Sequence, residues 1–394
     1  LMLAVTGSSS PVSKAVTGNQ KAVAGVFRSL RVGGALRTFI ESALPSMSDS
    51  EYLDALDQLS APVVPQVLEI AGGLSHNFAK NVISHLAEKH WLNFNPSQDY
   101  ASSANAPAAG AGDFSGVGHN LWFSAGGFYA RYDGEDNLSD TIVTGYDIRL
   151  GYDLSLESGW LAGAVLGFDN QRIGMDRPYG RVDVDSFSAA IYGGRQFQAG
   201  PGILRLLLGA SFSSHSVDSE RVVNIAGVRD SLKADYHGQT WQIFGEVAWN
   251  FNLGPNTSLE PYLNLTWQKT TLNSFNETGR LFALTTKKSS TDNFRTNLGL
   301  RAKAKITDKV SVSGALGWEH TFGSVRPETT VAFRDSGSYF KAQGSPISRD
   351  SVTAEVSLNV DITESVSFKA SYDGAFGKKS QRHAGTAMLS FSWK

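Results

Sequence analysis

Two short stretches carry residue types that hydrolytic chemistry uses. They are Ser214-His215 and Trp318-Glu319-His320. A serine hydrolase needs its base within hydrogen-bond reach of the nucleophile, and a carboxylate can orient a histidine in the same way. Adjacent residues of a strand point to opposite faces, so neither stretch can form such a pair within one strand. We therefore expect no catalytic residue.

The other histidines and the glycines do not have the spacing of a metal or phosphate site. His76 and His85 are nine residues apart, which is not a metal-ligand spacing. The 40 glycines include no Walker-type loop. No metal and no cofactor are therefore expected. Cysteine is absent, which is compatible with a chain that crosses an oxidising compartment unfolded.

Bulk composition argues against two further classes of protein. The 394 residues include 35 basic and 37 acidic ones, with a formal net charge of −2. This balance lacks the basic field of a nucleic-acid-binding protein. No apolar run approaches the roughly 18 to 20 residues that a membrane-spanning helix needs. We expect neither a nucleic-acid partner nor a helical membrane bundle.

The elements that would position the polar residues are mostly strands. From residue 119 onward the apolar and polar positions alternate, which places one kind on each face of a strand. The predicted strands are 119–132, 141–154, 159–173, 182–197, 202–217, 237–252, 257–272, 293–305, 309–322, 350–362, 365–377 and 382–393. At roughly 12 to 16 residues they exceed the strands of soluble sandwiches and suit a tilted crossing of a membrane.

The connections between these strands alternate in length. Tight turns follow the even-numbered strands, whereas longer links, notably 218–236, 273–292 and 323–349, follow odd-numbered ones. This asymmetry is typical of outer-membrane barrels, whose short turns are periplasmic and whose long loops are extracellular. We therefore predict an all-β membrane protein, a 12-stranded antiparallel outer-membrane β-barrel with lipid outside and water inside.

The facing pattern of the last strand supports this fold. Gly385, Ala387, Leu389, Phe391 and Trp393 share one face, and the residues between them are mostly polar or small. Tryptophans mostly fall near predicted strand ends, where interfacial girdles are expected. They are Trp122, Trp160, Trp241, Trp249, Trp267, Trp318 and Trp393.

The residues before the strands have a helical pattern. Val23, Val26, Phe27 and Leu30 fall at helical spacing, and Ser48 with Glu51 forms a helix start. A further helix is predicted over 63–91, and Ala, Ser, Pro and Gly dominate a linker over 93–118. The fold prediction thus includes an N-terminal α-helical lead-in.

These features resemble the C-terminal translocator of the monomeric (type Va) autotransporters of type V secretion. The matching pieces in the barrel are Leu121-Trp122, Tyr192-Gly193-Gly194, Arg221-Val222-Val223, Leu232-Lys233-Ala234-Asp235-Tyr236, Leu259-Glu260-Pro261-Tyr262, Phe275-Asn276-Glu277-Thr278-Gly279, Leu298-Gly299-Leu300-Arg301, Trp318-Glu319-His320 and Tyr372-Asp373-Gly374. Before it, Gly18-Asn19-Gln20-Lys21-Ala22-Val23-Ala24 and Asp54-Ala55-Leu56-Asp57-Gln58-Leu59-Ser60 resemble the lead-in. The chain departs from the family pattern at Ala61-Pro62, where the helix would start later or kink, and at Lys394, which follows the terminal aromatic.

The resemblance implies a division of the chain and a function. Residues 1–17 would be a passenger remnant with Leu3-Ala4-Val5 as its last strand, 18–92 a lead-in with a pore-plugging helix, 93–118 the linker and 119–394 the barrel. The unit would be a non-catalytic monomer in the Gram-negative outer membrane that exports or displays its own passenger. Its partners would be outer-membrane lipid, the passenger, the barrel assembly machinery and periplasmic chaperones.

The resemblance also suggests functional residues. A barrel of about 12 strands can hold one helix, and a helix satisfies its own backbone hydrogen bonds. We place the plug between Ala71 and Trp91, with His76, Asn77, Lys80 and Asn81 facing the lumen. The charged lumen residues would be Glu246, Glu260, Arg301, Lys303, Glu319, Glu355, Lys369 and Asp373, either paired internally or forming a solvated wall. Leu389, Phe391 and Trp393 would be the assembly signal.

Three alternatives remain open at this point. Some relatives cleave themselves at an asparagine of the plug helix, but Asn77, Asn81 and Asn93 lack the paired-asparagine context of that subgroup. An outer-membrane barrel hydrolase would need a serine–histidine site, for which the sequence gives only the two stretches above. A passive pore would not need 118 residues before the barrel. A barrel that only anchors its passenger at the cell surface also remains open, and this function overlaps with export.

Overall fold

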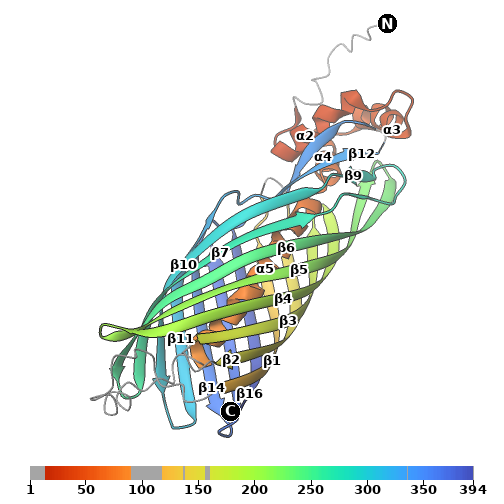
Figure 1. Cartoon of the computed structure of the whole chain (residues 1–394). Coiled ribbons are helices and arrows are strands. Elements are labelled where there is room, and N and C mark those ends of the chain that lie inside the picture. The colour runs from red at the N-terminus through yellow and green to blue at the C-terminus, as the bar shows by residue number, and fades with distance from the viewer. Residues whose placement is uncertain (1–13, 90–117, 136–137, 156–159, 335, 394) are drawn as a thin grey trace, which may run out of the picture.

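A closed barrel with a helix inside it forms the body of the molecule (Figure 1). The computed structural model describes residues 14–89, 118–135, 138–155, 160–334 and 336–393. Residues 1–13 of the predicted passenger remnant, nearly all of the predicted linker, and Asn93 therefore lie outside the described residues. Among the described helices, none is long and apolar enough to cross a membrane.

Twelve antiparallel strands make the barrel, as predicted. They are β1 (Gly118–Tyr132), β2 (Thr141–Ser155), β3 (Trp160–Asp176), β4 (Tyr179–Ala199), β5 (Gly202–Ile225), β6 (Val228–Gly254), β7 (Thr257–Leu272), β10 (Ser289–Lys305), β11 (Val310–Phe322), β14 (Asp350–Asp361), β15 (Val366–Gly377) and β16 (Ser380–Trp393). The first and last strands close the ring, with His119 opposite Trp393 and Tyr132 opposite Ser380.

The outer face carries an apolar belt with aromatic borders. On β6 the outward residues run from Trp241 through Ile243 and Val247 to Trp249, all exposed. Eight residues span about 27 Å along the strand, and at the tilt of about 40° usual in barrels this is about 21 Å of height, which covers most of the lipid-facing band of outer-membrane barrels. Beyond Trp241 the outward positions become polar, as at Asp235 and Lys233. The belt therefore defines where lipid covers the barrel.

Two predicted loops are strands instead. Segment 218–236 continues β5 and β6 into a long hairpin that turns at Ala226 and Gly227, both at positive φ, as tight hairpins require. Likewise β3 and β4 extend until only Arg177 and Pro178 separate them. The loop prediction was wrong because the outward residues there are polar. The alternation continues where water replaces lipid outside, and most inward positions stay apolar, with Arg221 and Asp230 as buried exceptions.

A second sheet is built from the long links. The segments between β7 and β10 and between β11 and β14 contain β8 (Phe275–Asn276), β9 (Leu284–Thr286), β12 (Glu328–Phe333) and β13 (Tyr339–Gln343). They pair in the order β13-β12-β9-β8. This sheet lies over the long-loop end of the barrel (Figure 1).

Three helices lie beside this sheet and the long hairpin. They are α2 (Gly18–Val26), α3 (Ala35–Ala43) and α4 (Asp49–Leu59), joined by short 3-10 turns, η1 (Phe27–Ser29) and η2 (Leu44–Ser46). Helix α2 contacts β13, α4 contacts β5, and Phe39 of α3 contacts Phe282 in the link before β9. Capping boxes start α2 at Thr17 with Gln20 and α4 at Ser48 with Glu51. We refer to α2–α4, the four-stranded sheet and the hairpin residues 214–239 together as the cap.

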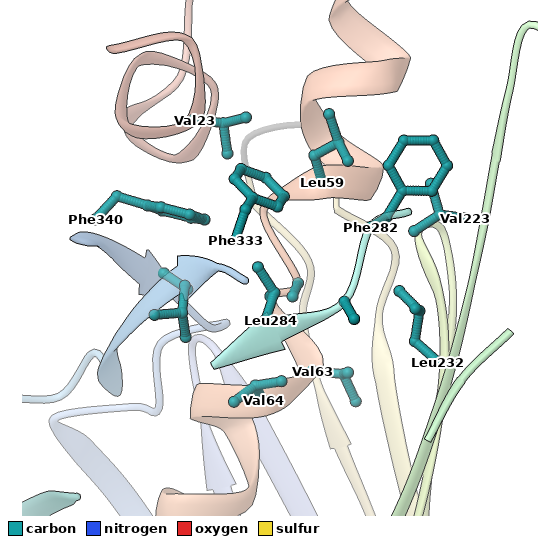
Figure 2. Packing of buried hydrophobic residues seen from close by; sticks show 14 of the residues in the cluster. Val23, Leu59, Val63, Val64, Val223, Leu232, Phe282, Leu284, Phe333 and Phe340 are labelled. Carbon is teal, nitrogen blue, oxygen red and sulfur yellow. The ribbon is translucent and has the colours of Figure 1, made fainter. Parts of the chain in front are cut away.

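The cap has its own hydrophobic core. Helix residues Val23 and Leu59 meet Phe333, Phe340 and their neighbours from the sheet and hairpin (Figure 2). The other labelled members of this cluster are Val63, Val64, Val223, Leu232, Phe282 and Leu284. Sequence-distant segments therefore share one core at the long-loop end.

The carboxylate of Asp230 binds the backbone of one loop of the cap. Asp230 accepts hydrogen bonds from the backbone N–H groups of Arg280, Leu281 and Phe282, with the shortest, from Leu281, at 2.7 Å. Burial opposes ionisation of Asp230, but these donors outweigh it and hold the pKa of its carboxyl below the usual range. Ionised Asp230 thus stabilises the cap at neutral pH.

The helix inside the barrel is α5 (Val63–Lys89). It matches the predicted helix, whose last two residues lie outside the described part. After α4 the chain reverses at Ala61, which has a φ of 49°, and α5 begins directly after Pro62. The departure from the family pattern at Ala61-Pro62 therefore marks the junction of two helices.

The apolar belt makes a testable prediction about stability. Leu208 is 66% exposed on the outer face of β5, at the level of the belt. Leu208→Arg should lower the free energy of unfolding by about 2–4 kcal/mol, because a cation near the bilayer midplane is poorly solvated. The matched change Ser214→Arg, on the same face beyond the belt, should cost about 0–1 kcal/mol. Denaturant unfolding in lipid vesicles would measure both, and equal costs would contradict the placement of the belt.

Candidate functional site: the helix inside the barrel

Helix α5 runs from the cap toward the short-turn end and contacts the barrel wall on several sides (Figure 1). Near the cap, Glu69 pairs with Arg295 of β10 at 3.1 Å, and both side chains are buried. Nearly two turns further, Ser75 donates a hydrogen bond to Ser213 of β5 at 3.0 Å. The wall contacts thus begin before residue 71, where the sequence places the start of the plug.

Charged contacts continue along the middle of the helix. His76 Nε2 lies 3.1 Å from a carboxylate oxygen of Glu319 on β11. Lys80 donates to Asp373 of β15 at 3.1 Å, and Arg382 of β16 binds the same carboxylate. These two helix residues therefore engage acids on neighbouring parts of the wall.

A serine of the next turn joins two more wall residues. Ser84 donates to Glu355 of β14 at 2.5 Å and accepts from Lys369 Nζ of β15 at 3.0 Å. Asn77 and Asn81, on the same stretch of helix, each line a narrow cavity beside it. One face of α5 thus follows β11, β14 and β15.

The most buried contact lies near the end of α5. His85 Nε2 is 2.8 Å from Asp153 of β2, and the two side chains are 1% and 0% exposed. Asn120 also donates to this carboxylate at 2.7 Å, and the Tyr192 hydroxyl binds its other oxygen. Every polar neighbour of Asp153 named here is itself buried, so the contact is held from three strands and the helix.

Trp122 belongs to this contact and not to a membrane girdle. Its indole is 0% exposed and lies 4.5 Å, centroid to centroid, from the His85 ring. A side chain at Gly151 would collide with this indole, so glycine leaves it room. The girdle prediction was wrong for Trp122 because it used distance from the strand end, whereas the parity of β1 points this residue inward.

Four charged residues form a neutral cluster below the helix. Arg205 lies 2.6 Å from Glu246 and 3.1 Å from Glu260, and Arg301 lies 3.1 Å from Glu246 and also binds Glu260. Arg205 additionally donates to the Ala87 carbonyl at 3.1 Å. A cation at this position complements the negative end of the helix dipole.

The structure gives each proposed lumen residue a location. Glu246, Glu260 and Arg301 lie in the neutral cluster, whereas Glu319, Glu355, Lys369 and Asp373 contact α5 or residues bound to it. Lys303 is half-buried two residues after Arg301, on the same face of β10. Leu389, Phe391 and Trp393 are exposed on the outer face of β16.

Several wall residues escaped the sequence analysis. They are Asp147, Arg149, Asp153, Asp169, Arg205 and Arg295, all buried. Arg149 contacts both Asp147 and Asp169, and its guanidinium lies over the Phe78 ring of α5 at 5.7 Å. Assigning every second residue of each strand to the inward face would have found them, because Asp147, Arg149 and Asp153 share the inward face of β2.

Little open space remains beside the helix. One cavity beside the helix has a volume of about 110 Å³ and is lined by residues that include Glu69, Gly73, His76, Arg295 and Glu319. The neighbouring cavities hold about 10 to 20 Å³ each. Helix and side chains therefore fill most of the lumen cross-section.

The two hydrolase-like stretches separate in space. Ser214 points outward while His215 points inward, where it contacts Ser186 at 2.7 Å and Thr240 at 2.9 Å without a carboxylate in either bond. Glu319 faces α5, and His320 lies outside beside Asp350 at 2.7 Å. In the described part of the chain, no group of three or more His, Asp or Glu residues could hold a metal ion.

A closed antiparallel barrel that contains a helix entering from a cap defines a class of outer-membrane protein, and sequence comparison identifies the family. Residues 121–373 match the Autotransporter beta-domain, so this chain belongs to the autotransporter β-domain family. It is the translocator domain of an autotransporter in the outer membrane and mediates secretion of its passenger. The β-domain itself is not a catalytic family.

Curated relatives and solved structures agree with this assignment. Two proteins of Serratia marcescens named extracellular serine protease are 27% and 28% identical over 285 and 294 residues, 71% of this chain in both cases. The chain spans 27% of the length of each.

Two solved translocators share the fold. The translocator domain of NalP from Neisseria meningitidis aligns with a TM-score of 0.55, and the transport unit of AIDA-I from Escherichia coli with 0.51. Both are 17% identical, and the alignments cover 71% and 70% of this chain and 90% of each structure. At this identity the likeness supports the barrel fold.

Two adjacent glycines of α5 offer a matched test of its fit. A Cβ at Gly72 would lie 2.6 Å from Gln268 and 3.0 Å from Thr270 of the wall, whereas a Cβ at Gly73 would meet nothing within 4 Å. Both changes remove a helix glycine, so they alter intrinsic helix propensity equally. Gly72→Leu should accelerate hydrogen exchange of α5 amides about tenfold or more, because overpacking costs about 1–3 kcal/mol. Gly73→Leu should not accelerate it, and equal acceleration by both changes would contradict the packing.

Proposed function

We propose that α5 closes the translocation pore once the passenger has crossed. The observation that carries this proposal is the set of contacts from Glu69 to Ala87, which join the helix to six strands around the lumen. The cavities beside α5 support it, since those lined by the described residues hold only about 110 Å³ and about 10 Å³. The resting state is then a plugged translocator.

In this proposal the cap faces the extracellular side and the short turns face the periplasm. The asymmetry of the connections favours this orientation. The chain direction supports it as well: α2–α4 precede α5 and lie at the cap, so a passenger attached before them leaves from that end. The pore-closing helix then follows the passenger into the lumen.

The proposed partners follow from the outer surface and from the family. Lipid covers the apolar belt, and because the barrel closes on itself one chain suffices. Periplasmic chaperones would keep the unfolded strands soluble. We further propose that the barrel assembly machinery reads Leu389, Phe391 and Trp393, which lie exposed on one face of the last strand.

We also propose that the passenger carried by this translocator is a protease. It is supported by the name extracellular serine protease of the two Serratia marcescens relatives, most of whose length lies outside the matched region. A fluorophosphonate probe applied to cells that carry the full-length protein should label a passenger polypeptide. Absence of labelling in a secreted passenger would reject the serine-protease assignment and leave the translocator unaffected.

Conductance across planar bilayers tests the plug. The full chain should remain nearly closed, whereas a chain that begins at Gly118 should conduct steadily and at least about tenfold more, because an emptied barrel of this size encloses a water-filled lumen. A heat-dependent shift in electrophoretic mobility serves as the control for folding of both proteins. Equal, large conductance from both would exclude α5 as the plug, and a protein soluble without detergent that does not conduct would contradict the membrane assignment.

A second prediction concerns assembly. Trp393→Ala should reduce the folded, membrane-inserted fraction about fivefold or more if the terminal aromatic is recognised during insertion, whereas Trp267→Ala should change it little. The two tryptophans have similar exposure on the outer face, at 48% and 39%, so they lose similar lipid contact. The fraction of heat-modifiable barrel in isolated outer membranes is the measurement. Equal losses from both changes would assign Trp393 to the aromatic girdle alone.

A further inference from the structure

The four-stranded sheet of the cap has one open edge, on β13. Strand β13 pairs only with β12 in the sheet order. The Thr330 carbonyl of β12 accepts a bond from the Lys287 N–H and therefore points away from β13. Lys341 lies opposite Thr330 in the register, so its own N–H and C=O point away from β12 as well. The N–H and C=O groups of Tyr339 and Gln343, two residues to either side of Lys341, point away from β12 in the same way.

One position of this edge is already paired, by a side chain. The Asn19 carboxamide donates to the Gln343 carbonyl and accepts from the Gln343 N–H, both at 2.9 Å. Such a two-way exchange imitates the bond pattern of a neighbouring strand. The main-chain groups of Tyr339 and Lys341 on this edge have no partner within the described residues.

The edge lacks the features that usually prevent strand addition. It contains no proline, and the Lys341 ammonium is held by Glu328 on β12 at 2.9 Å instead of extending over the edge. Phe340 and Ala342 are buried beneath, which fixes the strand in place. An extended polypeptide could therefore add to β13 through main-chain bonds.

We propose that residues 2–6 of the same chain occupy this edge as a fifth strand of the cap sheet. The described chain begins at Lys14, and Asn19, five residues later, is bound to the edge at Gln343, so the described chain starts close to the edge. The segment reads Met-Leu-Ala-Val-Thr, and Gly7-Ser8-Ser9-Ser10-Pro11 after it has the composition of a turn. Eight residues between the segment and Ala15 can span about 26 Å, more than the roughly 14 Å length of the free edge.

This pairing would anchor the junction of passenger and translocator to the cap. It goes beyond translocation and does not require α5 to close the pore, so conductance and edge pairing can fail separately. The passenger would then begin from a strand fixed on the long-loop surface instead of from a free tether.

Cysteine cross-linking in the full chain tests the proposal, because the native sequence contains no cysteine. Lys341→Cys is combined with single cysteines at each of residues 2–6 and treated with a short thiol-specific cross-linker. Yields should alternate along the segment with period two, because every second residue of a paired strand shares the face of residue 341. The matched control Asn276→Cys, exposed on β8 at the opposite edge of the sheet, should give at least about fivefold less. Equal yields at 341 and 276, or no alternation, would overturn the proposal.

A second variant separates main-chain pairing from mere proximity. With cysteines at residues 4 and 339, Lys341→Pro removes the outward N–H without touching the bonds to β12, and should lower the cross-linking yield about fivefold or more. Lys341→Ala should retain it, and heat-dependent mobility confirms that both barrels are folded. Unchanged yield in the proline variant would overturn edge pairing. Dimers formed through Lys341→Cys alone would do the same, since they would assign the edge to a second copy of the chain.

Discussion

The backbone hydrogen bonds between β1 and β16 are the constraint on which the rest of the structure depends. Lipid offers no partner for an open strand edge, so the sheet must close on itself to cross the membrane. The closing register runs from His119 opposite Trp393 to Tyr132 opposite Ser380. Closure at twelve strands leaves a lumen too wide for wall side chains to fill alone, and the parity of each strand points polar residues into it. A helix inside is the compact solution, because α5 brings no unsatisfied backbone of its own.

The charges of the lumen are arranged so that the wall can hold the helix firmly and also tolerate an empty lumen. A buried charge without a partner is costly, and the wall meets this cost partly by itself. Arg205, Glu246, Glu260 and Arg301 form a neutral group, and Arg149 lies between two aspartates of the wall, Asp147 and Asp169. The acids that face α5 have partners from the helix: Asp373 pairs with the Lys80 ammonium, and Glu319 pairs with the His76 imidazole. When the helix is absent, water can solvate these acids, so the wall tolerates both states.

The number and positions of the strands and the helix over 63–91 could be predicted from the sequence. Apolar residues repeat every second residue in the strands and about every 3.6 residues in the helix, and this pattern is visible without knowing the tertiary contacts. Polar outward residues beyond the belt, such as Asp235, broke the expected apolar pattern although the inward parity continued. Trp122 was misplaced because two indications disagreed: its position near the strand end predicted the membrane girdle, whereas the alternation along β1 points it inward. The contact with His85 shows that it points inward. The inward orientation of Arg205 and Asp153 could have been predicted from the alternation along their strands. Their partners could not, because these lie on other strands and a local stretch of sequence does not determine how strands align across a barrel. The cap sheet was missed since β8 and β9 are two and three residues long, too short for any period.

The cap imposes an order on assembly. Its core joins Val23 and Leu59, which precede the barrel in sequence, to Phe282, Phe333 and Phe340 from links between barrel strands. These halves can meet only when the lead-in and the long links lie at the same end of a formed barrel. Helices α2–α4 share this core with the sheet, and together they are wider than the single helix that the lumen holds. In the translocation proposed above, the cap core therefore forms after the lead-in has been threaded. Because burial of its apolar side chains is favourable and is unavailable inside the polar lumen, it stabilises the threaded state against return.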